Sequence, residues 1–387
     1  MFKIRTYNQI STFGLEKLPT DRFQVAADID LPDAILLRSF DLHDVTIPET
    51  LKAVGRAGTG VNNIPVAEYS NRGIPVFNAP GANANAVAEL VIAGMLISAR
   101  NIEPALEFVR TLKGDDDSLD TQVEKGKKQF SGFELTGKTI GVVGLGAIGV
   151  KVCNAATALG MNVIGFDPQM TVESAWQLSS AAVKAGSLDE LITRADFISL
   201  QVPLNDHTRY LINASRVERM RNNVTLLNFA RAPVVDEAVV VAALNSGKMH
   251  AYVTDFPSNA LLNHDKAILL PHLGASTSEA EDNCAIMVAE QLQDFLENGN
   301  IRRSVNFPDV VLPRTEGVRL AIANENVPNM VSQITSALAE NNLNIIDMLN
   351  KSRGNYAYTL IDIETDVDAT TLEHIKAIHG VLSVRVI

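Results

Sequence analysis

The stretch TIGVVGLGAIG, residues 139–149, decides the fold of this chain, because an apolar run leads directly into a Gly-x-Gly-x-x-Gly turn. Residues 140–143 have the length and apolar character of a short buried strand. Residues 147–159 have the periodicity of a helix, and Gly160 follows as a natural helix stop. The stretch therefore predicts a strand, a tight glycine turn and a helix in direct succession.

An acidic residue completes this pattern. A second apolar strand, predicted over 161–166, ends at Asp167, 18 residues after Gly149. In a dinucleotide site, Gly144 would permit the tight turn, Gly146 would let the backbone approach a pyrophosphate, and Gly149 would let helix and strand pack closely. Asp167 would bind the adenosine ribose hydroxyls and repel a 2′-phosphate, so the sequence predicts NAD rather than NADP. A glycine turn in an unrelated α/β domain is the alternative, which strand, helix and acid together disfavour.

The composition narrows the class of protein. With 387 residues, of which 46% are hydrophobic, the chain is expected to form two or three domains with sizeable cores. The net charge of −12, without a Lys/Arg cluster, disfavours nucleic acid as a partner. Cys153 and Cys284 are the only cysteines, which fits a reducing cytoplasm and leaves no metal-type spacing. The N-terminus lacks an apolar leader, and the apolar run 84–99 contains Asn85 and Glu89, so neither secretion nor a membrane span is expected.

Short apolar strands alternate with helical segments on both sides of the glycine turn. This alternation predicts parallel, doubly wound sheets with ligands beyond the carboxyl ends of the strands. The expected strands are 2–7, 23–26, 34–38, 51–56, 75–78, 197–202, 225–230, 250–256 and 267–272. An apolar stripe over 88–110 predicts one long helix, and 276–298 predicts another. The acidic run 115–117 is expected to be a solvated loop, although so long a polar segment can also form an arm that contacts a partner subunit.

The C-terminal part of the chain is expected to be a separate unit. Residues 301–316 contain two prolines and show no periodicity, which is typical of a linker. Residues 317–387 then have the order βαββαβ of a ferredoxin-like unit. Its expected elements are strand 319–323, helix 328–341, strands 344–351 and 356–364, helix 370–378 and strand 382–387.

Four motifs resemble those of the D-2-hydroxyacid dehydrogenases: VGRAGTGVNN (54–63), GLGAIG (144–149), NFARAPVVDEAVV (228–240) and LPHLGAST (270–277). The last motif, together with the C-terminal unit, resembles the phosphoglycerate-oxidising branch of that family, and the unit itself is similar to an ACT domain. The resemblance implies two Rossmann-like domains and an ACT domain. The implied boundaries are 1–98 with 285–305 for substrate binding, 99–284 for NAD binding, 306–316 for a linker and 317–387 for the ACT domain.

The resemblance assigns the chemistry to two side chains. His272 is implied as the general acid/base, because oxidation of a secondary alcohol needs a base that titrates near working pH as hydride leaves. Arg231 is implied as the cation that pairs with the substrate carboxylate through its planar fork. One departure stands out, because residues 254–262 contain no Glu where the family has one that supports the catalytic histidine. The hypothesis is that Asn259 or a nearby carboxylate substitutes poorly for it.

Other positions carry over from the family motif by motif. Arg38 in LLRS corresponds to the arginine that binds the substrate phosphate, and Arg56, Ala57, Gly58 and Asn83 are implied as further substrate contacts. The implied cofactor positions are Thr59, Gly144, Gly146, Ala147, Ile148, Gly149, Asp167, Val202, Pro203, Thr208, Ala230, Asp255 and Gly274. In the ACT-like unit, Asn324, Asn326 and Asn344 are implied as effector contacts, although Asn324 stands where some members have His and Asn329 where Gly is common.

The resemblance implies NAD-dependent oxidation of D-3-phosphoglycerate to 3-phosphooxypyruvate, the first step of serine biosynthesis. It further implies a homo-oligomer with serine as an effector, no metal, and no membrane partner. Two alternatives remain open. One is a broader D-2-hydroxyacid dehydrogenase or 2-oxoacid reductase, for which Arg38 is the deciding residue. The other is a non-catalytic sensor of NAD or amino acids, which the missing Glu favours and the presence of both His272 and Arg231 disfavours.

Overall fold

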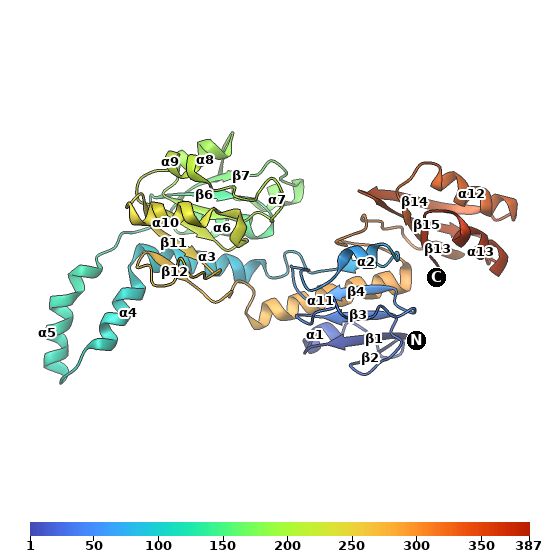
Figure 1. The fold of residues 1–387 in the computed structure, drawn as a ribbon, viewed down its shortest axis with the longest axis horizontal. Coiled ribbons are helices and arrows are strands. Elements are labelled where there is room, and N and C mark those ends of the chain that lie inside the picture. Colours follow the sequence, from blue (N-terminus) through green and yellow to red (C-terminus); the bar gives the residue numbers. More distant parts are fainter. The chain divides into compact units, whose positions relative to one another are not determined.

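The computed structural model describes all residues from 1 to 387 and divides them into two compact units. Unit 1 comprises Met1–Asn83 and Ser278–Ile387, and unit 2 comprises Ala84–Thr277. Unit 1 holds a five-stranded and a four-stranded sheet, and unit 2 holds a seven-stranded sheet (Figure 1). The predicted α/β class is confirmed.

Unit 2 is built on one parallel sheet. Its strands are β6 (Thr139–Val143), β7 (Asn162–Phe166), β8 (Val183–Lys184), β9 (Phe197–Leu200), β10 (Val224–Asn228), β11 (Met249–Thr254) and β12 (Ala267–Leu269). They lie in the order β12-β11-β10-β9-β6-β7-β8, and every pair is parallel. The chain order reverses at β6, between β9 and β7, and in such sheets this is where ligands bind.

Helices cover both faces of this sheet. They are α3 (Ala84–Ala99), α6 (Ala147–Ala158), α7 (Val172–Gln177), α8 (Leu188–Arg194), α9 (Ala214–Arg219) and α10 (Glu237–Asn245). Val142 belongs to the core beneath α3 and α6, whereas its neighbour Val143 belongs to the core beneath α8, α9 and α10. Because alternate strand residues point to opposite faces, both faces are apolar and the strands read as continuous hydrophobic runs.

The segment after α3 differs from the sequence prediction. The single helix expected to about Arg110 ends at Ala99, because Asn101 takes a left-handed conformation with φ of 49°, and α4 (Ile102–Thr111) continues at an angle of 64°. By length and composition no single helix could cross a bilayer, and this bent pair passes the test only when its two helices are taken together.

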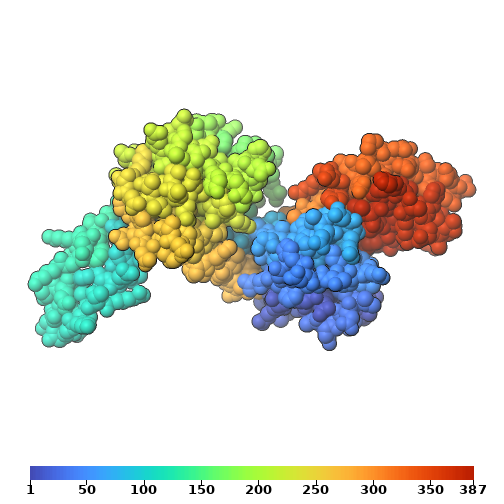
Figure 2. Space-filling view, viewed as in Figure 1, coloured from blue at the N-terminus to red at the C-terminus, as the bar shows by residue number.

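The acidic run 115–117 is not the loop that was predicted. Asp115 accepts a hydrogen bond from the backbone N–H of Ser118 and begins α5 (Asp116–Gly126), followed by η1 (Lys127–Phe130). An N-cap carboxylate and acids in the first turn stabilise a helix start, which explains the error. Residues 102–130 form an arm that stands out from the body of unit 2, with no buried residue on α4 or α5 (Figure 2).

The first sheet of unit 1 is parallel and packs against one long helix, mainly through β4. Its strands, in the order β2-β1-β3-β4-β5, are β1 (Phe2–Tyr7), β2 (Phe23–Ala26), β3 (Ala34–Leu37), β4 (Ala53–Arg56) and β5 (Val76–Phe77). The helices that accompany this sheet are the short α1 (Thr12–Leu15) and α2 (Val66–Ser70) and the long α11 (Ser278–Asn298). A Cβ at Gly55 would lie 2.5 Å from Val288 Cγ1, so this glycine lets α11 pack directly on β4.

The C-terminal sheet has the predicted βαββαβ order. Its elements are β13 (Val318–Glu325), α12 (Met330–Glu340), β14 (Ile345–Arg353), β15 (Tyr356–Ile363), α13 (Ala369–Ala377) and β16 (Val381–Val386). The strands pair antiparallel in the order β14-β15-β13-β16. Leu320 and Ile322 pack under α12 and α13, whereas Ala321 and Ala323 belong to the core that also contains α11. One face of the sheet is therefore buried by its own helices and the other by the body of unit 1.

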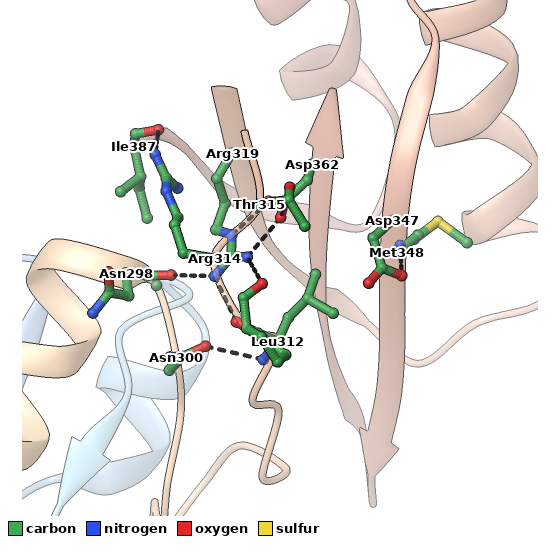
Figure 3. A network of polar contacts seen from close by, with 12 residues as sticks. Asn298, Asn300, Leu312, Arg314, Thr315, Arg319, Asp347, Met348, Asp362 and Ile387 are labelled. Atoms are coloured by element: carbon green, nitrogen blue, oxygen red, sulfur yellow. Dashed lines mark hydrogen bonds and ion pairs between the residues drawn. The ribbon is translucent and has the colours of Figure 1, made fainter. Parts of the chain in front are cut away.

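Three side chains of the C-terminal sheet bind the carbonyl oxygens at the end of α11. Arg385 donates to Phe295 O and Leu296 O at 3.2 and 2.9 Å, and Tyr358 Oη donates to Gly299 O at 2.8 Å. Arg319 donates to Asn298 O at 3.0 Å while forming a buried ion pair with Asp362 (Figure 3). The last carbonyls of a helix lack partners within it and favour positive charge. We call Arg319, Tyr358 and Arg385 the α11 cap.

Candidate active site

The glycine turn of unit 2 has the geometry that a bound pyrophosphate requires. Gly144 has φ of +92°, and a Cβ there would lie 2.6 Å from Gln201 O. A Cβ at Gly149 would overlap the carbonyl oxygen of Gly144, whereas one at Gly146 would meet nothing within 4 Å. The first and third glycines are therefore required by backbone strain and packing, and the second leaves open space beside the N-terminus of α6.

A cavity of about 350 Å³ lies beyond the ends of β6, β7 and β9. It brings together several predicted cofactor positions, namely Gly144, Gly146, Asp167, Val202, Pro203 and Thr208, and adds Asn205 and His207, which the sequence did not single out. Asp167 accepts one backbone hydrogen bond at each carboxylate oxygen, from Leu145 N and Gln169 N, both at 2.8 Å. Each oxygen keeps a lone pair for a ribose hydroxyl, so these residues fit the adenosine half of NAD.

Arg231 lies just beyond β10, where buried side chains fix the backbone. Asn228 Nδ2 donates to Arg231 O at 3.0 Å, and Thr254 Oγ1 donates to Asn228 O at 2.9 Å, which ties the end of β10 to that of β11. The Arg231 side chain is exposed, and its guanidinium donates to Ala230 O at 2.6 Å. Within unit 2 it forms no ion pair, so the guanidinium is available for a carboxylate.

His272 and Asp255 meet at the ends of β11 and β12. The strand expected over 267–272 ends at Leu269, and His272 occupies a turn with φ of 53°, where its N–H donates to Asp255 O at 3.1 Å. Asp255 is buried, with Oδ2 accepting from Gly274 N at 3.1 Å and Oδ1 without a partner. Burial raises the pKa of Asp255, and the Gly274 N–H and the charges of His272 and Arg231 oppose that rise only in part. The unpaired oxygen is an acceptor for an amide donor of the kind that nicotinamide carries.

No carboxylate in unit 2 is hydrogen-bonded to the ring of His272, although Asp255 lies near enough for the two charges to interact. Its ring stands edge-on to Phe256 at 5.2 Å, with an interplanar angle of 74°. Within unit 2 the ring makes no hydrogen bond or ion pair. Asn259, which was proposed to substitute for the supporting Glu, is exposed. The departure seen in the sequence therefore persists in the structure of this unit.

In unit 1 the predicted substrate contacts gather at the carboxyl ends of β3 and β4. Arg38 directly follows β3, and its Nη2 lies 2.6 Å from Glu281 Oε1 on the first turn of α11. Arg56 ends β4, and its guanidinium lies so close to Gly58 that a Cβ there would be 2.5 Å from Nη1. Ala57 N donates to Leu37 O at 2.7 Å, and Thr59 Oγ1 donates to Asn83 Oδ1 at 3.3 Å. Glu281 was missed because it is 243 positions from Arg38 and no local pattern links them.

The three asparagines proposed for the effector do not meet within one chain. Asn324 pairs with Ala357, whereas Ile345, directly after Asn344, pairs with Ile363 at the opposite end of β15. Asn324 is buried, with Nδ2 bonded to Glu325 O at 2.7 Å and Oδ1 unpaired. Asn326 Nδ2 donates to Gly354 O at 3.0 Å, and Asn344 Nδ2 donates to Glu364 Oε1 at 2.7 Å. A site made from all three would need a second copy of the sheet.

The departure at Asn329 has a local explanation. Asn329 takes φ of 71° immediately before α12. Asparagine is one of the few residues other than glycine that adopt this left-handed conformation at modest cost. The turn therefore keeps the backbone geometry that glycine would give.

The sequence is similar to those of known dehydrogenases. The sequence family described as "D-isomer specific 2-hydroxyacid dehydrogenase, NAD binding domain" matches residues 92–274. The D-3-phosphoglycerate dehydrogenase of Methanocaldococcus jannaschii is 40% identical over 268 residues, which cover 68% of this chain and 49% of that protein. That of Haemophilus influenzae is 34% identical over 352 residues, covering 87% of this chain and 81% of that protein. The chain thus spans about half the length of the first relative and most of the second.

The solved structures give the same fold. The apo form of Rhodotorula graminis D-mandelate dehydrogenase superposes with a TM-score of 0.66 at 23% sequence identity. The superposition covers 81% of this chain and 99% of that one. Similarity at this level of identity bears on the fold alone.

Proposed function

Because this chain belongs to the D-isomer-specific 2-hydroxyacid dehydrogenases, we propose that it oxidises D-3-phosphoglycerate to 3-phosphooxypyruvate. It is an NAD-dependent enzyme, with NAD as its cofactor. The observation that supports this substrate is that the chain has arginines for both of its anionic groups, the carboxylate and the phosphate. Arg231 stands unpaired by any acid in unit 2, and Arg38 and Arg56 stand together in unit 1. Relatives named D-3-phosphoglycerate dehydrogenase support the same substrate.

The roles of the side chains follow from their chemistry. Bound NAD supplies the acceptor for the hydride that leaves C2 of the substrate. Arg231 binds the substrate carboxylate through its guanidinium fork and so orients C2. His272 takes the proton of the C2 hydroxyl in oxidation and returns it in reduction. Arg38 binds the phosphate, and Asp255 accepts a hydrogen bond from the carboxamide of the cofactor through its unpaired oxygen.

The substrate is tested by measuring NADH consumption with 3-phosphooxypyruvate, glyoxylate and 2-oxoglutarate. We expect 3-phosphooxypyruvate to have the highest kcat/KM. Arg38→Ala should lower that value by about 10- to 100-fold, the loss expected for hydrogen bonds to a charged group. Arg22→Ala, which removes an ion pair of a half-exposed arginine with Glu297 in the same unit, is the matched control and should change kcat/KM little, because Arg22 is not among the predicted substrate contacts. Equal loss on glyoxylate with Arg38→Ala would contradict phosphate recognition.

Two other functions are each favoured by one observation. Glu281 neutralises part of the charge at Arg38, which favours a broader 2-oxoacid reductase. The lack of a carboxylate hydrogen-bonded to the ring of His272 favours a sensor that binds NADH without turnover. The same assay separates them, because the first predicts turnover without preference for a phosphorylated acid and the second predicts NADH binding alone.

Assembly and regulation form part of the proposal. The arm exposes 53% of Leu106 and 57% of Val109 on α4, an apolar stripe that a second copy of the chain would bury, so we propose a homo-oligomer. Serine is the proposed effector, with its amino group donating to the unpaired Oδ1 of Asn324. Serine should lower the rate of the wild-type enzyme but not of Asn324→Ala. The two unpaired, buried cysteines support a cytoplasmic location.

A further inference from the structure

We infer that Glu281 is an internal competitor for the anion-binding position of Arg38, and that it sets how strongly the enzyme prefers a phosphorylated substrate. The inference rests on the proposed function, in which Arg38 binds the substrate phosphate. Its starting point is the ion pair between Arg38 Nη2 and Glu281 Oε1 at 2.6 Å, with 41% and 43% of the two side chains exposed. The first turn of α11 thus presents a carboxylate to the cation that the substrate needs.

The charges around this pair form one cluster. Cys284, one helical turn after Glu281, is buried, and its pKa is raised to about 11 by burial. The charges of Arg56 and Arg38 oppose that rise and the charge of Glu281 adds to it. Two arginines and one carboxylate therefore act on the same point beside the ends of β3 and β4. Because Glu281 is negatively charged, the net positive charge at this point is smaller than the two arginines would give alone.

A carboxylate and a phosphate present the same kind of oxygen acceptor to a guanidinium fork. Glu281 therefore uses a hydrogen-bonding position on Arg38 that a phosphate oxygen could also use. Because an exposed ion pair contributes little to stability, a ligand can displace it. A phosphate with nearly two negative charges should displace it more readily than a single carboxylate. Glu281 thereby acts as a specificity-determining residue that weakens phosphate binding at Arg38 and so limits the preference for a phosphorylated substrate.

The neighbouring residue provides a matched control. Asp282 carries the same charge on the same helical turn, but its Oδ1 accepts a hydrogen bond from Ser11 Oγ at 2.5 Å. It forms no ion pair with Arg38. Asp282→Asn therefore removes one negative charge from α11 without releasing the arginine, and Glu281→Gln removes the charge and the ion pair together.

The test is calorimetric titration of the full-length protein, saturated with NAD, with inorganic phosphate. At low ionic strength we expect Glu281→Gln to bind phosphate about three- to tenfold more tightly than wild type, since a competing ion pair and a like charge are removed. The gain should shrink at high salt, which screens exposed charges. Asp282→Asn should bind like wild type, and Arg38→Ala defines the background from other sites. KM for 3-phosphooxypyruvate should fall in Glu281→Gln by the same factor, with KM for glyoxylate unchanged.

The outcomes separate this inference from the proposed function. If Glu281→Gln binds phosphate no better than wild type, or no better than Asp282→Asn, the inference is overturned even when 3-phosphooxypyruvate is a good substrate. If phosphate binding tightens only in Glu281→Gln while 3-phosphooxypyruvate is not reduced, Glu281 is the competitor at Arg38 and the proposed substrate is wrong.

Discussion

Asp362→Asn tests whether a buried charge holds the C-terminal sheet to the rest of unit 1. Arg319 has 0% of its side chain exposed and Asp362 has 2%. The pair is bidentate, with Nε–Oδ1 at 2.6 Å and Nη2–Oδ2 at 2.7 Å, and Arg319 also donates to the carbonyls of Asn298, Leu312 and Pro313. Asparagine would leave a buried guanidinium without a counter-charge.

The expected cost follows from this geometry. Removing one partner of a buried ion pair costs about 3–5 kcal/mol. The lower end applies, because the three carbonyls keep their hydrogen bonds to Arg319. For a unit of this size, about 3 kcal/mol corresponds to a fall in Tm of roughly 6–12 °C. Differential scanning calorimetry at pH 7 measures it, with Glu373→Gln as control, because Glu373 forms an exposed pair with Lys376 and its loss should cost little.

The pH dependence gives a second readout. Burial alone would raise the pKa of Asp362, but the hydrogen bonds and charge of Arg319, with the Thr315 hydroxyl, outweigh burial and lower it. A carboxyl whose folded-state pKa is lowered contributes stability that is fully present above its unfolded pKa of about 3.9, and that is lost as pH falls through the folded value. The difference between wild type and Asp362→Asn should therefore be constant near neutral pH and shrink below about pH 4. A Tm unchanged at pH 7, or lowered no more than in Glu373→Gln, would refute the reasoning.

Three further changes test the cofactor site, the arm and the histidine. Gly149→Ala should weaken NADH binding at least about tenfold in a fluorescence titration, because the new methyl would displace Gly144 O, while Gly186→Ala, outside the cavity, should not. Leu106→Asp should reduce the sedimentation coefficient by dissociating the oligomer, and an unchanged value would exclude the arm as the interface. Asn259→Glu should raise kcat and alter the pH–rate profile by supplying a carboxylate to His272, and Asn259→Gln should do neither.

The sequence predicted what local pattern determines. The glycine turn, Asp167 and the alternation of strands with helices are encoded within a few residues, and the structure has them within a few positions of the expected bounds. The βαββαβ order was readable for the same reason, since each element carries its own periodicity. The bend at Asn101 was missed because one left-handed residue leaves the apolar stripe intact. The helix after Asp115 was missed because the same acids suit a solvated loop and an N-terminal turn.

Long-range pairs were beyond the sequence. Asp362 lies 43 positions from Arg319, and Glu281 lies 243 positions from Arg38, so neither pair follows from spacing. The asparagines proposed for the effector show the opposite case, in which residues that match one motif do not lie together in the fold. Asn324 and Asn344 fit a motif, yet the antiparallel register of β13, β14 and β15 puts them at opposite ends of the sheet. Only the register, which depends on the whole sheet, decides which side chains meet.

The α11 cap makes this helix a connection between the C-terminal sheet and Arg38 as well as a core element. The helix has 21 residues, a length of about 30 Å at the usual rise per residue. At its C-terminal end, Arg319, Tyr358 and Arg385 donate hydrogen bonds to backbone carbonyls. At its N-terminal end, the first turn carries Glu281, whose carboxylate pairs with Arg38. α11 therefore connects the C-terminal sheet directly to Arg38, through hydrogen bonds at one end of the helix and an ion pair at the other.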